Sequence, residues 1–285
     1  MDKKKMAIAI PASVIADTPH LREKTAKIGL IGRAAAIFRV NEIIVYPDSP
    51  KVNQSREMDL IATLLAYMET PQYLRKRLFK LEPRLQFAGI LPPLRTPHHP
   101  LNKKAKNLKT GQYREGVVLS KTNEGVLVDI GVEQPALLRE KQLAVGVRLT
   151  LRIAKAASDP VEVQTASHDE IPYYWGYRVV VEKRSFKKLI ENAKFDLTIA
   201  TSKKGVSFAD VAYELAGNWE KARNVLVAFG APANGLYEIA RDEGSSLDDL
   251  VDFVINTIPS QGTETVRTEE ALLASLAILN VQFGF

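Results

Sequence analysis

The sequence contains no cysteine among its 285 residues. This absence excludes a disulfide framework, a zinc site built on thiolates and a cysteine nucleophile. Apolar runs of about 20 residues, the length needed to span a bilayer, are missing as well. The apolar run from Met6 to Pro11 follows a basic start, Met1 to Lys5, and is too short for the core of a signal peptide. We therefore predict a soluble, cytoplasmic protein that does not associate with a membrane.

The usual nucleotide-binding signatures are also missing. The chain has neither the G-x-x-x-x-G-K-[ST] loop nor a G-x-G-x-x-G motif after a strand. A P-loop enzyme or an ordinary Rossmann cofactor site is therefore not expected. His98-His99 and His168-Asp169-Glu170 are the only runs that suggest a metal, but adjacent side chains point apart and no third ligand follows at a familiar spacing. We interpret these histidines as surface or linker residues and predict no metal.

What is present is an ordinary globular composition with a basic balance. Hydrophobic residues make up 46% of the chain and charged residues 25%, which is enough for two modest cores. The formal net charge of +6 favours a polyanionic partner, although charge alone does not separate nucleic acid from an anionic membrane.

The first ninety residues alternate between strand and helix patterns. Residues 7–10 predict a short buried strand, and apolar side chains recur at helical spacing from Leu21 to Phe38. A strand is predicted again at 42–46, and a second helical stripe covers 60–68. This alternation is typical of a parallel sheet.

The pattern changes after residue 92. A Pro-rich stretch leads into a cluster of lysines, followed by short strands at 116–120, 125–130 and 147–153 with no convincing helix between them. A small barrel explains these strands more simply than further α/β units do. The lysines of the cluster are Lys103, Lys104, Lys106 and Lys109.

The α/β pattern resumes near Tyr177. Strands are predicted at 178–182, 196–200, 225–229 and 253–255, and helices at 185–191, 207–216 and 268–279. The last helix is apolar on all sides, which predicts that it is buried. We therefore predict one discontinuous α/β domain, residues 1–92 and 167–285, with a β-barrel inserted at 93–166.

Two loops are the candidates for a binding site. In open α/β sheets ligands bind at the carboxyl ends of the strands, and the loop from Asn256 to Glu270 runs from such an end to the start of a helix. Thr268 can cap that helix, so helix initiation explains residues 268–270 but not Gln261 to Thr265. The second loop is 229–232, where a glycine follows an apolar strand.

These segments together resemble the SPOUT class of RNA methyltransferases, in its archaeal and eukaryotic branch with an inserted OB-like domain. The resemblance rests on 27–40 with Arg33, on 171–177 (Ile-Pro-Tyr-Tyr-Trp-Gly-Tyr), 196–202, 225–230 and 256–271. It implies an α/β fold with a C-terminal trefoil knot, a homodimer, and S-adenosyl-L-methionine held in the knot largely by backbone groups. The cofactor-binding residues that it implies are Thr201, Ser202, Phe229, Gly230, Ile255, Asn256, Ile258, Gln261, Gly262 and Thr263. Of these, Gly230 and Gly262 are expected to leave room for the cofactor.

The same resemblance implies methylation of RNA, at a uridine ring nitrogen of large-subunit rRNA. Arg33 and Arg267 are candidates for binding phosphate or the uracil anion, and Glu264 is the nearest candidate base. A surface ion pair or a dimer contact is the alternative explanation of each. A non-catalytic RNA-binding or ribosome-assembly factor that retains the fold, and a SPOUT member that methylates protein, also stay open.

The inserted segment is the expected RNA-binding part. Residues 125–131 resemble an S1-type OB strand, and such barrels bind single-stranded nucleic acid through basic and aromatic surfaces. Because aromatic residues are sparse here, we predict sequence-tolerant phosphate binding in place of base stacking. The residues expected to contact RNA are Lys103, Lys104, Lys106, Lys109, Arg114, Lys121 and Arg148.

Overall fold

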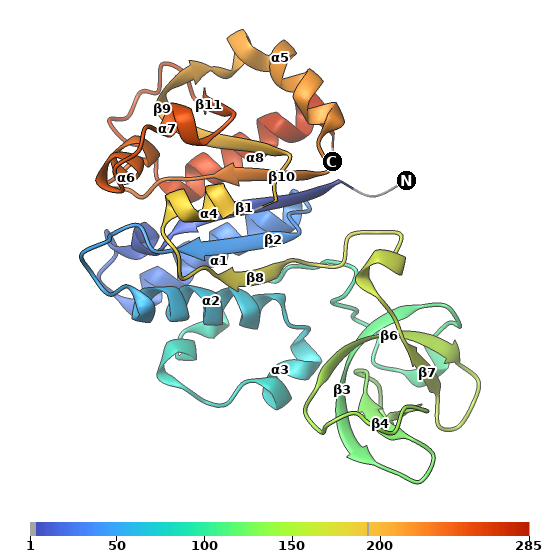
Figure 1. The fold of residues 1–285 in the computed structure, drawn as a ribbon. Helices are drawn as coiled ribbons and strands as arrows, with labels where there is room; N and C mark the ends of the chain where they lie inside the picture. The colour runs from blue at the N-terminus through green and yellow to red at the C-terminus, as the bar shows by residue number, and fades with distance from the viewer. Residues whose placement is uncertain (1–3, 193, 285) are drawn as a thin grey trace. The chain divides into compact units, whose positions relative to one another are not determined.

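The computed structural model describes residues 4–192 and 194–284, and the chain forms two compact units (Figure 1). Unit 1 comprises Met1–Met68, Pro83–Pro93 and Tyr177–Phe285, and unit 2 comprises Glu69–Glu82 and Leu94–Gly176. Residues 1–3 of the basic start lie outside the described residues. Within the described part of the chain, no helix has both the length and the apolarity to cross a membrane.

Unit 1 is built on a six-stranded parallel sheet in the order β11-β9-β10-β1-β2-β8. Six apolar segments from both ends of the chain therefore form one sheet, as the strand and helix patterns predict. Its strands are β1 (Lys5–Pro11), β2 (Glu42–Tyr46), β8 (Arg178–Val181), β9 (Leu197–Ser207), β10 (Asn224–Ala228) and β11 (Phe253–Asn256).

The helices of unit 1 cover the sheet, so the central strands have almost no exposed surface. They are α1 (Leu21–Ile37), α2 (Ser55–Glu69), α4 (Phe186–Asn192), α5 (Phe208–Lys221), α6 (Leu236–Asp242), α7 (Leu247–Leu250) and α8 (Thr268–Phe283), with the short 3-10 turns η1 (Ala12–Ile15), η2 (Pro83–Leu85) and η3 (Ala88–Ile90).

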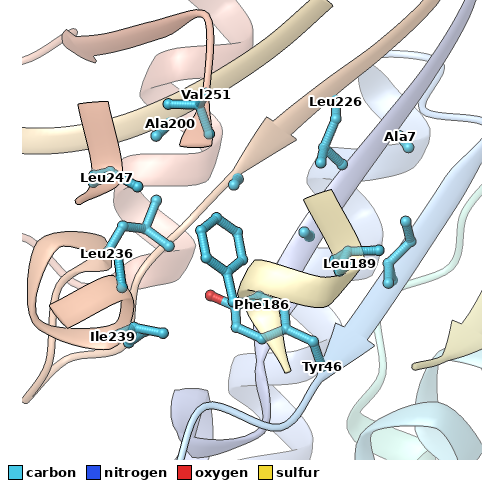
Figure 2. Close-up of a cluster of buried hydrophobic side chains, with 14 residues drawn as sticks. Ala7, Tyr46, Phe186, Leu189, Ala200, Leu226, Leu236, Ile239, Leu247 and Val251 are labelled. Atoms are coloured by element: carbon cyan, nitrogen blue, oxygen red, sulfur yellow. The ribbon is translucent and has the colours of Figure 1, made fainter. Parts of the chain in front are cut away.

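Alternate residues along β1 and β10 pack into a core cluster with residues of α4, α6 and α7, and the intervening residues, such as Ile8 and Val227, are buried too. Both faces of the sheet are therefore covered, as expected for parallel strands. Figure 2 shows Phe186 of α4 between Tyr46 and the side chains of α6 and α7. The rings of Tyr46 and Phe186 have centroids 5.2 Å apart.

The last helix differs from the expectation of complete burial. Leu272, Leu276 and Leu279 recur at helical spacing and are buried, but Leu273 is 47% exposed and Val281 86% exposed. Only one face of α8 packs within the unit, where it contacts α1. The apolar composition of α8 therefore predicted more burial than the helix has in the single chain.

Unit 2 contains a closed five-stranded barrel in the order β3-β4-β5-β7-β6. The strands are β3 (Tyr113–Lys121), β4 (Val126–Asp129), β5 (Ala136–Leu138), β6 (Arg148–Lys155) and β7 (Glu162–Thr165), with the 3-10 turns η4 (Ala105–Asn107) and η5 (His168–Glu170). The three predicted strands correspond to β3, β4 and β6. The sequence did not predict β5 and β7, which span only three and four residues.

The boundaries of unit 2 differ from the expected 93–166, because the segment Glu69–Glu82 packs on the barrel. This segment carries α3 (Gln72–Leu78), and the ring of Tyr73 lies against Gly131, where an added Cβ would come within 2.6 Å of it. The Tyr73 hydroxyl donates a hydrogen bond to the Glu115 carbonyl at 2.7 Å, and Arg77 pairs with Asp129 at 2.6 Å.

Candidate functional site

A pocket of about 350 Å³ lies in unit 1 where three neighbouring strands end. Its walls come from the second half of β9, from the turn after β10, and from the loop that joins β11 to α8. The volume falls in the range of about 300 to 1,000 Å³ that is typical of small-molecule sites. The carboxyl ends of parallel strands are where open α/β sheets bind ligands, so both position and size indicate a ligand site.

The structure brings seven of the ten expected cofactor residues to this pocket, from three separate segments of the chain. They are Thr201, Ser202, Phe229, Gly230, Asn256, Ile258 and Gln261. The lining also includes residues that sequence reasoning missed, among them Lys203 and Lys204 directly after Ser202, and Thr268, Ala271 and Ser275 on α8. The α8 residues repeat at helical spacing, which was the available signal for one helix face at the site.

The other three expected residues lie outside the lining. Ile255 is fully buried, and Thr263 is exposed and contributes its carbonyl to a hydrogen bond with Gln261. Gly262 is exposed, and an added Cβ there would meet nothing within 4 Å, so no protein atom crowds this glycine and its expected role in leaving room for a ligand stays a prediction. Gly230 is the restricted position, since a Cβ there would lie 2.9 Å from the Gly235 Cα.

Three hydroxyl groups from different elements hold three consecutive carbonyls at the end of β10. Thr201 on β9 donates to the Ala228 carbonyl at 3.0 Å, and Tyr46 on β2 donates to the Phe229 carbonyl at 3.0 Å. Thr268 on α8 donates to the Gly230 carbonyl at 2.9 Å. Tyr46 is fully buried, and this burial raises its pKa well above the ordinary value, so its hydroxyl keeps the proton that it donates. The turn after β10 is thereby fixed before any ligand enters.

Side-chain amides hold the loop after β11 in a similar way. Asn256 donates to the Lys203 carbonyl at 3.1 Å and accepts from the Ile258 N–H at 3.0 Å. Gln261 donates to the carbonyls of Thr263 and Glu264, at 2.9 Å and 3.1 Å. Gln261 thus stabilises the loop with the same amide that was expected to make a polar contact with the ligand.

Thr268 does not cap α8, in contrast to the sequence expectation. The N-cap position belongs to Arg267, whose backbone N–H is bound by the carboxylate of Glu270 at 3.0 Å. Thr268 is the first helical residue, and its hydroxyl is directed to the Gly230 carbonyl instead. A residue whose type suits helix initiation therefore connects two walls of the pocket.

The three candidate catalytic residues do not line the pocket. Arg33 on α1 donates to the Pro93 carbonyl at 2.9 Å, whereas Glu264 and Arg267 are exposed in the loop that leads to α8. The ionisable side chains that do line the pocket are Lys203, Lys204 and Glu238.

The two lysines of the pocket have different partners. Lys204 contacts the Glu238 carboxylate at 2.5 Å, and this hydrogen bond lowers the pKa of Glu238. The ammonium of Lys203 donates to a neutral group, the Glu264 carbonyl, at 3.2 Å. Lys203 therefore retains a positive charge at the pocket wall that this contact does not neutralise.

Unit 2 carries most of the excess positive charge, with 16 Lys and Arg residues against 11 Asp and Glu residues. Of the residues expected to contact RNA, five lysines are exposed, although Lys104 also lies 3.9 Å from Glu133. These exposed lysines are Lys103, Lys104, Lys106, Lys109 and Lys121.

Two arginines of the expected RNA-binding set have internal roles instead. Arg114 has no exposed surface and donates to the carbonyls of Asn102 and Ile130. Arg148 pairs with Glu69 and Glu115, each at 2.7 Å. Because Arg114 has no exposed surface, the expectation of direct RNA contact is wrong for this arginine. The side chain of Arg148 is 27% exposed, so its contact with RNA stays a prediction.

The first histidine pair is also not a surface feature. His98 is fully buried, with Nε2 2.9 Å from the Glu69 carbonyl and 3.1 Å from the Glu69 carboxylate. Burial of Glu69 would by itself raise the pKa of its carboxyl, but hydrogen bonds from His98 and Arg148 lower this pKa to about 2. In the described parts of both units, no group of three or more His, Asp or Glu side chains is arranged to hold a metal ion.

A parallel sheet whose strand ends enclose a preorganised pocket, together with a separate basic barrel unit, defines an α/β ligand-binding protein with an accessory β-barrel. The sequence model of the family described as "Putative RNA methyltransferase" matches residues 5–279. The match covers almost the whole chain, both ends of the sheet and the barrel included. The chain therefore belongs to this RNA methyltransferase family.

Individual relatives agree with this assignment. A Mus musculus protein named "28S rRNA (uridine-N(3))-methyltransferase" is 35% identical over 306 residues, which cover 96% of this chain and 75% of the relative. The Drosophila melanogaster protein of the same name is 32% identical over 314 residues, and the match covers 96% of this chain but only 61% of the fly protein. An uncharacterized protein of Halobacterium salinarum is 33% identical over 292 residues, with 96% and 98% of the two chains covered.

Proposed function

We propose that the pocket of unit 1 binds S-adenosyl-L-methionine and that the protein transfers its methyl group to ring nitrogen 3 of a uridine in large-subunit rRNA. The family assignment supports methyl transfer to RNA. The names of the mouse and fly relatives, which the chain matches over 96% of its length, support the uridine nitrogen and the large-subunit rRNA.

The observation that carries the proposal is the pocket with its fixed β10 turn. The hydroxyls of Tyr46, Thr201 and Thr268 leave the turn at Gly230 in one conformation, which suits a ligand held by backbone groups. Phe229, Ile258 and Val266 contribute apolar wall, while serine, threonine, asparagine and lysine side chains contribute polar wall. Such a mixture fits a molecule that joins a flat heterocycle to hydroxyl groups and a charged amino acid.

The residues of the chain have two tasks in this reaction. Bound S-adenosyl-L-methionine supplies an electrophilic methyl group on a sulfonium, so the protein must hold the uridine nitrogen in line with that group. The uridine nitrogen carries a proton at neutral pH, so the site must also accept this proton or stabilise the anion that results. Lys203 is suited to the second task, because its ammonium lies at the pocket wall and can attract a uracil oxygen that gains negative charge. Glu264 stays our candidate base, and Arg33 and Arg267 stay candidates for binding the RNA.

We further propose that the fold is of the SPOUT class, with its trefoil knot in the segment from β11 to α8. This segment contacts β9 through Asn256 at the end of β11, the β10 turn through Thr268, and α1 through Glu269, which lies 3.5 Å from Lys27. A chain end that is packed among three earlier elements is consistent with a knot.

The exposed apolar side chains of α1 and α8 support the homodimer proposed for this class. Leu30 and Ile37 on α1 are 56% and 51% exposed, and Leu273 and Val281 on α8 are exposed as well. The two helices pack against each other, so these side chains can form a continuous apolar surface for a second copy of the chain.

Unit 2 is proposed as the OB-like, RNA-binding part. Its exposed lysines can contact phosphates, and each phosphate contact makes affinity fall more steeply with salt. The relevant unit for a deletion is 69–82 with 94–176, since α3 packs on the barrel.

Isothermal titration calorimetry of the whole chain with S-adenosyl-L-methionine and with its demethylated product tests the proposed function. Binding of both ligands in the presence of EDTA is the expected result, followed by methyl transfer to rRNA that mass spectrometry maps to a uridine. Absence of heat and of a thermal shift with either ligand would reject the enzyme and favour the non-catalytic assembly factor. Methylation that maps to protein and not to RNA would reject the proposed substrate.

A further inference from the structure

Unit 2 gathers three aromatic side chains that are far apart in the sequence. Tyr113 begins β3, whereas Tyr173 and Trp175 lie about sixty residues later in the Ile171–Tyr177 segment. The ring centroids of Tyr113 and Tyr173 are 6.3 Å apart, those of Tyr113 and Trp175 6.1 Å, and those of Tyr173 and Trp175 5.8 Å. These distances are typical of interacting rings, so the three residues form one aromatic cluster.

Trp175 is the buried base of the aromatic cluster, and a polar network fixes it. Its side chain is 5% exposed, and its indole N–H donates to the Glu115 carboxylate at 2.6 Å. The same carboxylate accepts hydrogen bonds from Arg148 and Thr150, each at 2.7 Å. Arg148 thus acts from inside the unit by holding the group that orients Trp175.

The tyrosines are the exposed part of the cluster. Tyr173 is 43% exposed, and Tyr113 is half-buried, with its hydroxyl 3.4 Å from the Glu170 carbonyl. Both rings are supported from behind by Trp175, so a flat molecule that stacks on Tyr173 meets a ring whose position is already restricted. Such preorganisation reduces the entropy lost on binding.

Polar and basic side chains flank the aromatic cluster on the outer face of the barrel. Tyr113 pairs with Arg152 on β6, and Arg152 pairs with Gln164 on β7, so the three side chains form a row on one face of the sheet. Arg152 and Gln164 are exposed, whereas their neighbours Leu151 and Ile153 point into the barrel core. An arginine beside an exposed aromatic ring provides a cation where a stacked nucleotide has its phosphate.

We propose that Tyr173 and Tyr113 form a stacking site for an unpaired base of single-stranded RNA, with Arg152 binding the adjacent phosphate. This inference rests on the proposed function for the identity of the polyanion as RNA. The net positive charge of unit 2 favours a polyanion over an apolar peptide. It revises the sequence expectation of phosphate binding without stacking, because the aromatics are sparse in the sequence but gathered in space.

The test measures affinity of the whole chain for a fluorescent ten-residue uridine oligoribonucleotide and for the same oligomer with abasic sites. Tyr173→Ala should weaken binding of the uridine oligomer by about 5- to 150-fold, the range for loss of one base–aromatic stack. Tyr173→Phe should retain most of the affinity, because it keeps the ring. Tyr213→Ala is the matched control, since Tyr213 is 95% exposed on α5 of unit 1.

Salt and abasic titrations separate stacking from phosphate contact. Tyr173→Ala should leave the slope of affinity against salt unchanged and should abolish the preference for uridine over abasic RNA. Arg152→Gln should reduce that slope, whereas Arg139→Gln, at an arginine paired with Glu124 and Glu162, should not.

Two outcomes would overturn the stacking site. One is equal binding of wild type and Tyr173→Ala, with both variants shown to be folded by circular dichroism. The other is equal loss in Tyr173→Phe and Tyr173→Ala, which would assign the effect to the hydroxyl. Cofactor titration of the same samples keeps the two proposals distinct, since failure to bind S-adenosyl-L-methionine rejects the methyltransferase while the stacking result stands.

Discussion

The hydroxyl of Thr268 donates a hydrogen bond to the Gly230 carbonyl at 2.9 Å and thereby joins the first turn of α8 to the turn after β10. Both segments line the pocket, although Gly230 and Thr268 are 38 positions apart in the sequence. With Tyr46 and Thr201, this contact holds the strand end in one conformation. The pocket is therefore ordered by contacts that involve no ligand.

Replacement of Thr268 by valine removes this hydrogen bond while preserving the shape of the side chain. The Gly230 carbonyl then loses its donor, so we expect the free energy of unfolding to fall by about 1 kcal/mol. Affinity for S-adenosyl-L-methionine should fall by about 10-fold, because the turn is less ordered. Calorimetry and urea unfolding measure both effects. Thr268→Ser, which keeps the hydroxyl, should behave like wild type, and equal loss in both variants would contradict the role of the hydrogen bond.

Gly230 and Gly262 form a matched pair of glycines beside the pocket. A Cβ at Gly230 would lie 2.9 Å from the Gly235 Cα and 3.0 Å from the Leu236 nitrogen, both backbone atoms that cannot easily move. Gly230→Ala should therefore destabilise the chain by about 1 to 3 kcal/mol and weaken cofactor binding. Gly262→Ala should change stability by less than about 0.5 kcal/mol, because an added Cβ there meets no protein atom within 4 Å. A loss of stability at Gly262 as large as that at Gly230, measured by urea unfolding, would contradict this difference in packing.

Lys203 and Arg33 are expected to act on the RNA and not on the cofactor. Lys203→Met should lower kcat for methyl transfer by about 100-fold, as for loss of one group that stabilises a developing anion. Arg33→Ala should also slow the transfer. Both variants should bind S-adenosyl-L-methionine within about 2-fold of wild type. Lys221→Met, at an exposed lysine of α5, is the control. If a variant loses cofactor affinity and methyl-transfer rate to the same extent, the residue that it replaces has a cofactor-binding or structural role instead.

His99 should make the stability of unit 2 sensitive to mild acid. Burial, with the charge of His98 as a smaller cause, lowers the pKa of His99 from 6.5 to about 3. Below pH 6.5 the unfolded chain therefore binds a proton at His99 that the folded chain does not bind. The free energy of unfolding is therefore highest above pH 6.5 and declines as the pH falls toward 3. Glu69, with its pKa lowered from 4.5 to about 2, adds a further loss only below pH 4.5.

The contribution of His99 can be isolated between pH 7 and 4.5. The ring Nε2 of His99 lies 2.6 Å from the Glu69 carbonyl, and the amide of glutamine can donate to the same carbonyl. His99→Gln should therefore stay folded and show a flatter dependence of Tm on pH in this window. An unchanged slope in the variant would mean that the pKa of His99 does not differ between the folded and the unfolded chain.

Val281 is 86% exposed on the apolar face of α8, where the proposed homodimer would bury it. Val281→Glu should convert a dimer of the 31.6 kDa chain into a monomer in size-exclusion chromatography with light scattering. Tyr213→Glu on α5, at an even more exposed position, should leave the oligomeric state unchanged. A wild-type protein that runs as a monomer would reject the dimer proposal.

The alternation of strands and helices could be read from the sequence, because apolar periodicity reports which side of an element faces a core. Both halves of the α/β unit and three strands of the barrel were predicted on this basis. The short β5 and β7 could not be, since three or four residues show too little periodicity. The packing of α3 on the barrel depends on the contact between Tyr73 and Gly131, which cannot be predicted from the types of these two residues.

Seven of the ten expected cofactor residues line one pocket, and they could be grouped from the sequence because three loops follow parallel strands and resemble a known family. The role of each residue was decided by tertiary structure. Gly230 and not Gly262 lies against backbone, and Thr268 binds a carbonyl of another loop instead of capping its helix. Arg114 is buried, and Arg148 pairs with two carboxylates of unit 2. Residue type and order determine which chemistry is available and which segments are apolar. Contacts between distant segments determine where a charge, a hydroxyl or a ring points, because one side chain can bind several partners and only the folded chain selects among them.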